Sequence, residues 1–325
     1  MSLLSGLLAA VGPIQVAPSW YASWTLDPWQ LVPTLIAAVL YYRRVWTLEQ
    51  EGRPVPLWRI WLFTSGIAVA LFAFTSPLHA IGEAQSMSVH MVEHLIIGDV
   101  VPLLVIFGLT GPVLRPILAL PVLGDLRWLT NPLVAMPLWG LNLFLWHFPG
   151  AYDAALGNDA VHAAQHICFL VTGGIMWAAL FETLPGPRWF GTGAKVGYVI
   201  LVRLLSTILG NIFTWSSTGF YHHYDNVPRL FGLSQAGDQS YGGVIMMSET
   251  GLVTLALLAV LVFRAAVESD QRQLLIERGV DVARVKRAVR YGRARELALQ
   301  ELGYIPSRFQ SDVPEVARPA GTATP

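Results

Sequence analysis

Seven stretches of the chain are apolar over a length that suits a membrane-spanning helix. A helix needs about 20 residues to cross a hydrocarbon core of about 30 Å. The stretches cover approximately residues 29–42, 58–74, 86–109, 132–147, 159–181, 194–215 and 241–263, and the first is the shortest. This pattern predicts an all-α fold, a polytopic membrane helical bundle with seven transmembrane helices.

The segments outside these stretches differ from them in composition. Residues 1–28 have no Lys or Arg before their apolar run, unlike a cleaved signal peptide, so we expect an outward-facing or interfacial segment. Residues 29–264 form the predicted transmembrane domain. Residues 265–310 mix charges of both signs with scattered aliphatic side chains, which predicts a cytoplasmic amphipathic helical tail. Residues 311–325 are rich in Pro, Ala and Thr and are expected to be disordered.

Basic residues fall in alternate connections between the predicted spans. The connections after the first, third and fifth spans hold or are flanked by Arg43, Arg44, Arg53, Arg59, Arg115, Arg127, Arg188 and Lys195. The connections on the other side hold only Arg229. Cytoplasmic loops are enriched in Lys and Arg. The pattern therefore predicts an N-terminus outside and a cytoplasmic C-terminus.

Composition supports a membrane protein and narrows its chemistry. The chain is 54% hydrophobic and 13% charged, with a formal net charge of zero and a mean hydropathy of +0.51. These values exclude an ordinary soluble protein of this length. We expect contact with membrane lipid and no nucleic-acid partner. The single cysteine, Cys168, excludes an intrachain disulfide and a Cys-x-x-Cys motif. Metal chemistry must therefore depend on His and Met.

The third predicted span begins with a stripe of metal-ligating residue types. Met87, His90, Met91 and His94 have the spacing i, i+3, i+4 and i+7, which places them on one face of a helix. Ionisable groups inside a bilayer are rare and usually mark a function. The same stretch also satisfies the His-x-x-Glu-His pattern of some metalloproteases. No downstream segment clearly supplies a third carboxylate ligand, and we do not expect an enzyme.

The other histidines reach the same depth of the predicted bundle. His162 and His166 form an i, i+4 pair at the start of the fifth span, and His147 ends the fourth. By the topology above, all eight histidines lie on the outer side. A single histidine near a helix end is usually an interfacial hydrogen-bonding residue, but two matched pairs favour a shared metal site. Imidazoles together with thioethers favour Cu(I).

Three charged residues fall near the middle of predicted spans. They are Asp99, Arg203 and Glu249, in the third, sixth and seventh spans. An unpaired charge at that depth would be costly. We therefore expect a structural ion pair between Arg203 and either Glu249 or Asp99.

Several short motifs occur together in this sequence in a characteristic order. They are Ser76-Pro77-Leu78, Ser88 to His94, Pro102-Leu103-Leu104, Trp146 to Pro149 with Tyr152-Asp153, His162-Ala163-Ala164-Gln165-His166, Asp238-Gln239 and Gly242-Gly243. In these motifs the chain resembles the CtaG-type cytochrome c oxidase assembly factors of bacteria, which are seven-span proteins associated with caa-type oxidases. The resemblance covers approximately residues 24–264 and leaves the charged tail outside.

The resemblance implies a role in maturing a haem-copper oxidase in the bacterial cell (inner) membrane. The implied partner is a cytochrome c oxidase subunit, and the implied cargo is copper, expected here as Cu(I). The motif residues carried over to this chain are His90, His94, His147, His162, His166, Asp238 and Gln239. Asp238 can cap the last span, and the two glycines after it can let a neighbouring helix approach.

Other functions remain open at this stage. Assembly can also mean scaffolding of subunits. Histidines on two helices could instead clamp haem in a membrane electron carrier, although each pair here lies one turn apart on a single helix. A copper transporter would need further ligands in the inner half of the membrane, where the sequence offers few.

Overall fold

The described part of the chain is entirely helical. The computed structural model describes residues 23–120, 126–290, 292–306 and 309, without the side chains of Leu126, Glu249 and Thr250. No strand occurs among these residues, which confirms the all-α prediction. The chain divides into two compact units. The first comprises the described residues up to Phe190 together with Gly197–Leu255, and the second comprises Gly191–Val196 and the described residues from Ala256 onward.

All seven predicted spans coincide with helices. The longer helices are α2 (Pro28–Gln50), α3 (Leu57–Thr75), α9 (Pro132–His147), α11 (Asp159–Phe181), α12 (Thr192–Trp215) and α13 (Gln235–Glu277). The third predicted span is composite: α5 (Met87–Leu95), a π-helical turn η2 (Ile96–Val100) and α6 (Val101–Gly108). Shorter helices are α4 (Pro77–Ala84), α7 (Gly111–Leu118) and α10 (Pro149–Leu156), with single turns η3 (Leu126–Thr130), η4 (His222–Tyr224) and η5 (Leu230–Gly232).

Five of these segments are long and apolar enough to cross a membrane. They are Leu57–Thr75, Met87–Gly108, Asp159–Phe181, Thr192–Trp215 and Gln235–Glu277. The other two predicted spans correspond to α2 and to α9, which has only 16 residues. The seven-span count and the orientation of the termini therefore stay predictions.

Polar caps fix where the histidine-bearing helices begin. Ser86 is the N-cap of α5, and its hydroxyl accepts a hydrogen bond from the backbone N–H of Val89. Asn158 is the N-cap of α11 and accepts from Ala160 and Val161. Side-chain oxygens at this position satisfy backbone donors that have no partner within the helix. The caps thus set which residues of α5 and α11 occupy the first turns.

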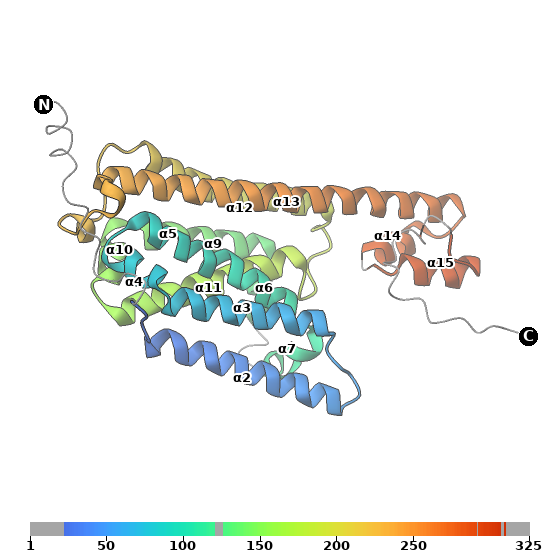
Figure 1. The fold of residues 1–325 in the computed structure, drawn as a ribbon. Coiled ribbons are helices and arrows are strands. Elements are labelled where there is room, and N and C mark those ends of the chain that lie inside the picture. Colours follow the sequence, from blue (N-terminus) through green and yellow to red (C-terminus); the bar gives the residue numbers. More distant parts are fainter. Residues whose placement is uncertain (1–22, 121–125, 291, 307–308, 310–325) are drawn as a thin grey trace, which may run out of the picture. The chain divides into compact units, whose positions relative to one another are not determined.

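Helix α11 lies among α2, α6, α9, α10 and η2 in the first unit (Figure 1). Its closest approach is at Gly173, where a Cβ atom would overlap the backbone carbonyl of Gly98 in η2. A second close approach joins α4 to α5, because a Cβ on Gly82 would lie 2.9 Å from Cα of His90. Glycine permits such backbone contacts. The first contact holds α11 against η2 about two turns beyond His166, and the second places α4 against α5 at His90.

A buried ion pair lies farther along the same helices. The guanidinium of Arg203 in α12 donates two hydrogen bonds to the carboxylate of Asp99, at 2.8 and 3.1 Å. The indole N–H of Trp177 in α11 donates a hydrogen bond to the backbone carbonyl of Asp99. The guanidinium of Arg203 lies 5.2 Å from the centroid of the Trp177 ring. The sequence predicts that Arg203 pairs with either Glu249 or Asp99, and in the structure it pairs with Asp99. The side chain of Glu249 lies outside the described residues.

The second unit contains the charged tail. After α13, it holds α14 (Val282–Arg290) and α15 (Ala294–Leu302). Their apolar faces and the end of α13 form a small core that includes Leu275, Val285 and Leu297. The predicted segment 1–28 lies mostly outside the described residues, and the predicted disordered segment 311–325 lies wholly outside them.

Candidate metal centre

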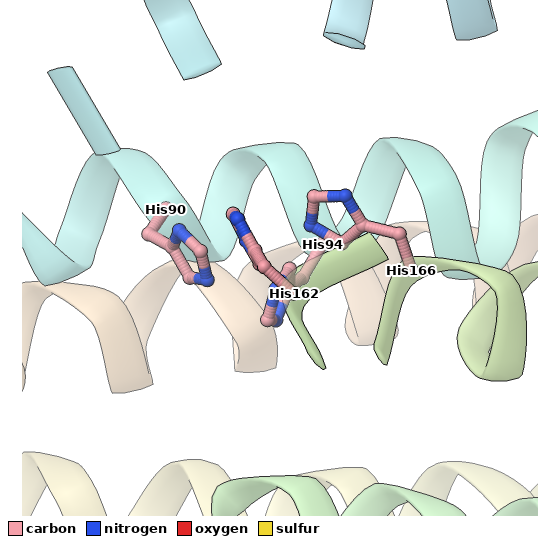
Figure 2. A group of neighbouring side chains, drawn as sticks. All are labelled: His90, His94, His162 and His166. Atoms are coloured by element: carbon pink, nitrogen blue, oxygen red, sulfur yellow. The ribbon is translucent and has the colours of Figure 1, made fainter. Parts of the chain in front are cut away.

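Four histidines from two helices form one compact group. His90 and His94 come from α5, and His162 and His166 come from α11 (Figure 2). One ring nitrogen from each lies within 4.8 Å of the other three. The ring centroids of His90 and His94 are 4.1 Å apart, and those of His90 and His162 are 5.3 Å apart. We call this set the four-histidine group.

The four-histidine group is buried, and six of its eight ring nitrogens lack hydrogen-bond partners among the described residues. The exposed fraction of these residues does not exceed 6%. Both ring nitrogens of His90 and His94 have no partner among the described residues, and neither has Nε2 of His162 or His166. Buried polar atoms in native proteins almost always have a hydrogen-bond partner, and leaving one such atom without a partner costs about 1–3 kcal/mol. Such a cluster of unsatisfied nitrogens fits a bound metal ion, which would accept their lone pairs.

In His166 and His147, a hydrogen bond at Nδ1 sets the tautomer of the ring. Nδ1 of His166 donates to Oε1 of Gln30 in α2, at 3.1 Å. Nδ1 of His147 donates to the backbone carbonyl of Leu143, at 2.7 Å. In both rings Nε2 then keeps its lone pair. Ligating histidines typically use this arrangement, in which a second hydrogen bond orients the ring.

His147 lies beside the four-histidine group instead of within it. Its ring centroid is 5.9 Å from that of His94. A small cavity of about 30 Å³ separates the two, and Met91 and Met246 contribute to its lining. Two histidines and two methionines are therefore among its lining residues, together with Asp99, Ser206 and mostly apolar neighbours. Met246 was not among the predicted ligands, because its place opposite α5 depends on how α13 packs.

The predicted stripe on α5 is divided between two neighbours. His90 and His94 face the histidines of α11. Met87 and Met91 are buried toward α13, where a Cβ on Gly242 would lie 3.8 Å from Cε of Met87 and 3.2 Å from Cγ of Met91. Met91 also reaches the small cavity, whereas Met87 packs near Gly242.

Asp238 and Gln239 connect α13 to other elements. The carboxylate of Asp238 accepts hydrogen bonds from the hydroxyls of Ser86 and Ser88 and, at 2.6 Å, from the backbone N–H of Met87. Asp238 thus binds the start of α5. The sequence alone predicts that it caps its own helix. Gln239 binds backbone groups of the segment before α13. Both residues position the histidine-bearing helix or its surroundings.

Three polar residues join the centre without having been predicted as ligands. His79 and Glu83 lie on α4, and Glu93 lies on α5 between the two histidines. Nδ1 of His79 donates to Oε1 of Glu93 at 2.8 Å, and Glu93 is fully buried. Burial lowers the pKa of His79, but the hydrogen bond and the charge of Glu93 outweigh it and raise that pKa overall. The nearby His162 ring lowers the pKa of Glu83, against the effect of burial.

A larger cavity lies on the other side of His166. It has a volume of about 230 Å³ and is lined almost wholly by apolar side chains of α2, α3, α6 and α11. Pockets for drug-sized ligands typically have about 300–1,000 Å³. Among its lining residues are His166 and Gln30, which are hydrogen-bonded to each other. The cavity is smaller than a typical site for a large organic cofactor.

Comparisons with known proteins identify related sequences but no related structure. The model of the family described as cytochrome c oxidase caa3 assembly factor matches residues 39–268. Uncharacterized proteins of Mycobacterium bovis and Mycobacterium tuberculosis are each 28% identical over 268 residues, which cover 77% of this chain and 40% of theirs. One from Mycobacterium leprae is 24% identical over 278 residues. The chain thus spans about two-fifths of these relatives. No solved structure matches.

Proposed function

Because the chain belongs to the cytochrome c oxidase caa3 assembly factor family, we propose that it binds copper and passes it to a subunit of a cytochrome c oxidase. The four-histidine group is the single observation that carries this proposal. It gathers four imidazole nitrogen donors from two helices in a site almost closed to solvent. Copper is then the cargo of the protein, and no catalytic step is required of it.

The chemistry of the donors supports Cu(I). Imidazole suits copper, and thioethers favour its reduced state. We assign His90, His94, His162 and His166 as the ligands that hold the ion. His147, Met91 and the additional Met246 line the adjoining cavity. The two methionines offer softer donors beside the group. Met87 packs near Gly242 and supports the helix instead.

Topology suggests where delivery takes place. With seven spans and a cytoplasmic C-terminus, the four-histidine group belongs to the outer half of a bacterial cell membrane. The helix ends near it meet the connections that carry few basic residues. A copper ion held there would be close to the outer surface, where an oxidase subunit embedded in the same lipid could receive it.

The two alternatives find less support in the arrangement of side chains. A haem carrier needs a cavity for the porphyrin between its ligands, whereas the cavity that adjoins the four-histidine group at His94 has a volume of only about 30 Å³. A transporter needs ligands deeper in the membrane. Of the three charged groups expected at that depth, Asp99 and Arg203 are paired with each other, and the side chain of Glu249 lies outside the described residues.

Deletion of the gene in a bacterium that produces a caa-type oxidase tests this function. We expect the oxidase to be made with reduced copper content and reduced activity, and added copper to restore part of both. Copper delivery predicts this dependence because excess metal can replace a slow supply route. The copper and activity of the membrane-bound oxidase are the measurements.

A plasmid copy of the wild-type gene is expected to restore the oxidase fully. A copy with His222→Ala should do the same, because that side chain is 87% exposed and pairs with the surface residue Asp225. Loss of the oxidase subunits themselves, regardless of added copper, would contradict copper delivery and indicate scaffolding.

A further inference from the structure

A second group of metal-ligating side chains lies beside the four-histidine group. His79 and Glu83 of α4 and His162 of α11 each offer one ligand atom, and these atoms lie within 4.8 Å of one another. The two oxygens of Glu83 point to different rings: Oε2 is 3.7 Å from Nε2 of His79, and Oε1 is 3.6 Å from Nδ1 of His162. These distances exceed those of hydrogen bonds.

The spacing suits a shared ion. Two ligand atoms at about 2.1 Å from a tetrahedral metal ion lie about 3.4 Å apart. The nitrogen–oxygen distances at Glu83 exceed this value by only a few tenths of an ångström. Small side-chain rotations would therefore place one ion between the carboxylate and both imidazoles.

The tautomer of His79 is already set for ligation. Its Nδ1 donates to the buried carboxylate of Glu93, at 2.8 Å. Nε2, the atom nearest to Glu83, therefore keeps a lone pair. A carboxylate behind a histidine ligand is a common way to fix the ring and increase its basicity. Glu93 has this role toward His79.

His162 offers a different nitrogen to each group. Nδ1 lies on the side of Glu83, whereas Nε2 is buried without a hydrogen-bond partner among the described residues. Its ring stacks on that of His79 at 5.4 Å and on that of His90 at 5.3 Å. The ring thus stands between the two groups. A neutral imidazole has one free lone pair, so the ring would present a donor atom to each group only as an imidazolate, after release of its remaining N–H proton to solvent.

The second group is also the more accessible of the two. The side chain of Glu83 is 30% exposed, whereas those of His79 and His162 are 5% and 2% exposed. His223, from the turn η4, donates a hydrogen bond to the backbone carbonyl of Glu83 at 2.9 Å. This contact holds the end of α4 against a connecting segment, so the carboxylate lies at the edge of the buried centre.

We propose that His79, Glu83 and His162 form a second metal site, which binds a divalent ion of the zinc type. Two imidazoles and one carboxylate are a ligand set that zinc uses in proteins, with the fourth position left to water. Such an ion would link α4 to α11, and with the copper site also filled it would share His162 as a bridging imidazolate whose proton has passed to solvent. The sharing rests on the function proposed above, whereas the divalent site itself does not.

Binding of Co²⁺, a spectroscopic substitute for Zn²⁺, to the purified full-length protein tests the site. We expect wild-type protein to bind Co²⁺ with visible absorption bands typical of a low-coordinate site. Glu83→Gln should weaken binding more than about 100-fold, since loss of even an indirect contact to a metal costs about 10–100-fold. Glu49→Gln is the matched control, because that carboxylate is exposed at the end of α2, and it should change nothing.

His94→Ala separates the second site from the copper site. His94 belongs only to the four-histidine group, so this variant should keep its affinity for Co²⁺ while its affinity for Cu(I) falls. The divalent site is refuted if wild-type protein binds no Co²⁺, if Glu83→Gln binds it as tightly as wild type, or if His94→Ala loses it too. Cu(I) binding, measured in parallel, tests the copper function separately. Circular dichroism establishes that each variant is folded.

Discussion

Purified protein with His90→Ala and His166→Ala is expected to lose high-affinity Cu(I) binding. The double variant removes one ligand from each helix, so the two imidazoles that remain come from different helices and cannot close the site. Loss of an indirect contact to a metal already costs about 10–100-fold in affinity. Removal of two direct ligands should therefore weaken binding by more than about 1,000-fold. Anaerobic titration against a coloured Cu(I) chelator measures it.

The matched control for this variant is His222→Ala. Its side chain lies away from the four-histidine group and is 87% exposed. It should bind Cu(I) as the wild type does. Copper binding by the double variant at wild-type stoichiometry and affinity would place the ion elsewhere. An intense Soret absorption band in the wild-type protein would instead favour haem.

Arg203→Leu is expected to destabilise the protein strongly. The carboxylate of Asp99 would stay buried, with its two charge-assisted hydrogen bonds lost. Removing one partner of a buried ion pair typically costs about 3–5 kcal/mol. Unfolding of the purified protein in detergent, followed by circular dichroism as temperature rises, should show a clearly lower midpoint.

The double variant Arg203→Leu with Asp99→Leu identifies the cause. It removes both charges, and a buried ion pair replaced by apolar residues often costs little. We expect its midpoint to recover most of the loss. A single variant as stable as the wild type, or a double variant less stable than the single one, would contradict this account of the pair.

Local sequence rules were enough to find the four-histidine group. The i, i+4 spacing places His90 with His94 and His162 with His166 on one face each, whatever surrounds the helix. That the two faces meet depends on long-range packing. The similar depth of the two histidine pairs in their predicted spans suggested that the faces meet. In the structure, the contact of Gly173 with Gly98 holds α11 against η2, the π-helical turn that follows α5.

The residues that the sequence did not identify depend on contacts between distant segments. Glu83 and His79 lie on a short helix whose position is set by Gly82 against His90, and no periodicity reveals such a contact. Asp238 illustrates the same limit. Capping rules assign an Asp near a helix start to its own helix, but here it accepts from the start of α5.

The π-helical turn between α5 and α6 is a further feature without a sequence signal. It contains Asp99, and π-helical turns often occur at functional sites. The extra residue in the turn changes the helical phase, so ideal α-helical spacing from His94 does not give the direction of Asp99. The expectation of an ion pair with Arg203 came from charge alone, which explains why two partners remained possible.

X-ray absorption of the copper-loaded wild-type protein tests the central claim most directly. One Cu(I) per chain with three or four nitrogen neighbours at about 2.0–2.1 Å, the distance usual for imidazole on a first-row metal ion, is the predicted result. Multiple-scattering features of imidazole should accompany them. A protein that retains no copper, or copper surrounded mainly by sulfur, would contradict the assignment of the four-histidine group as the copper site.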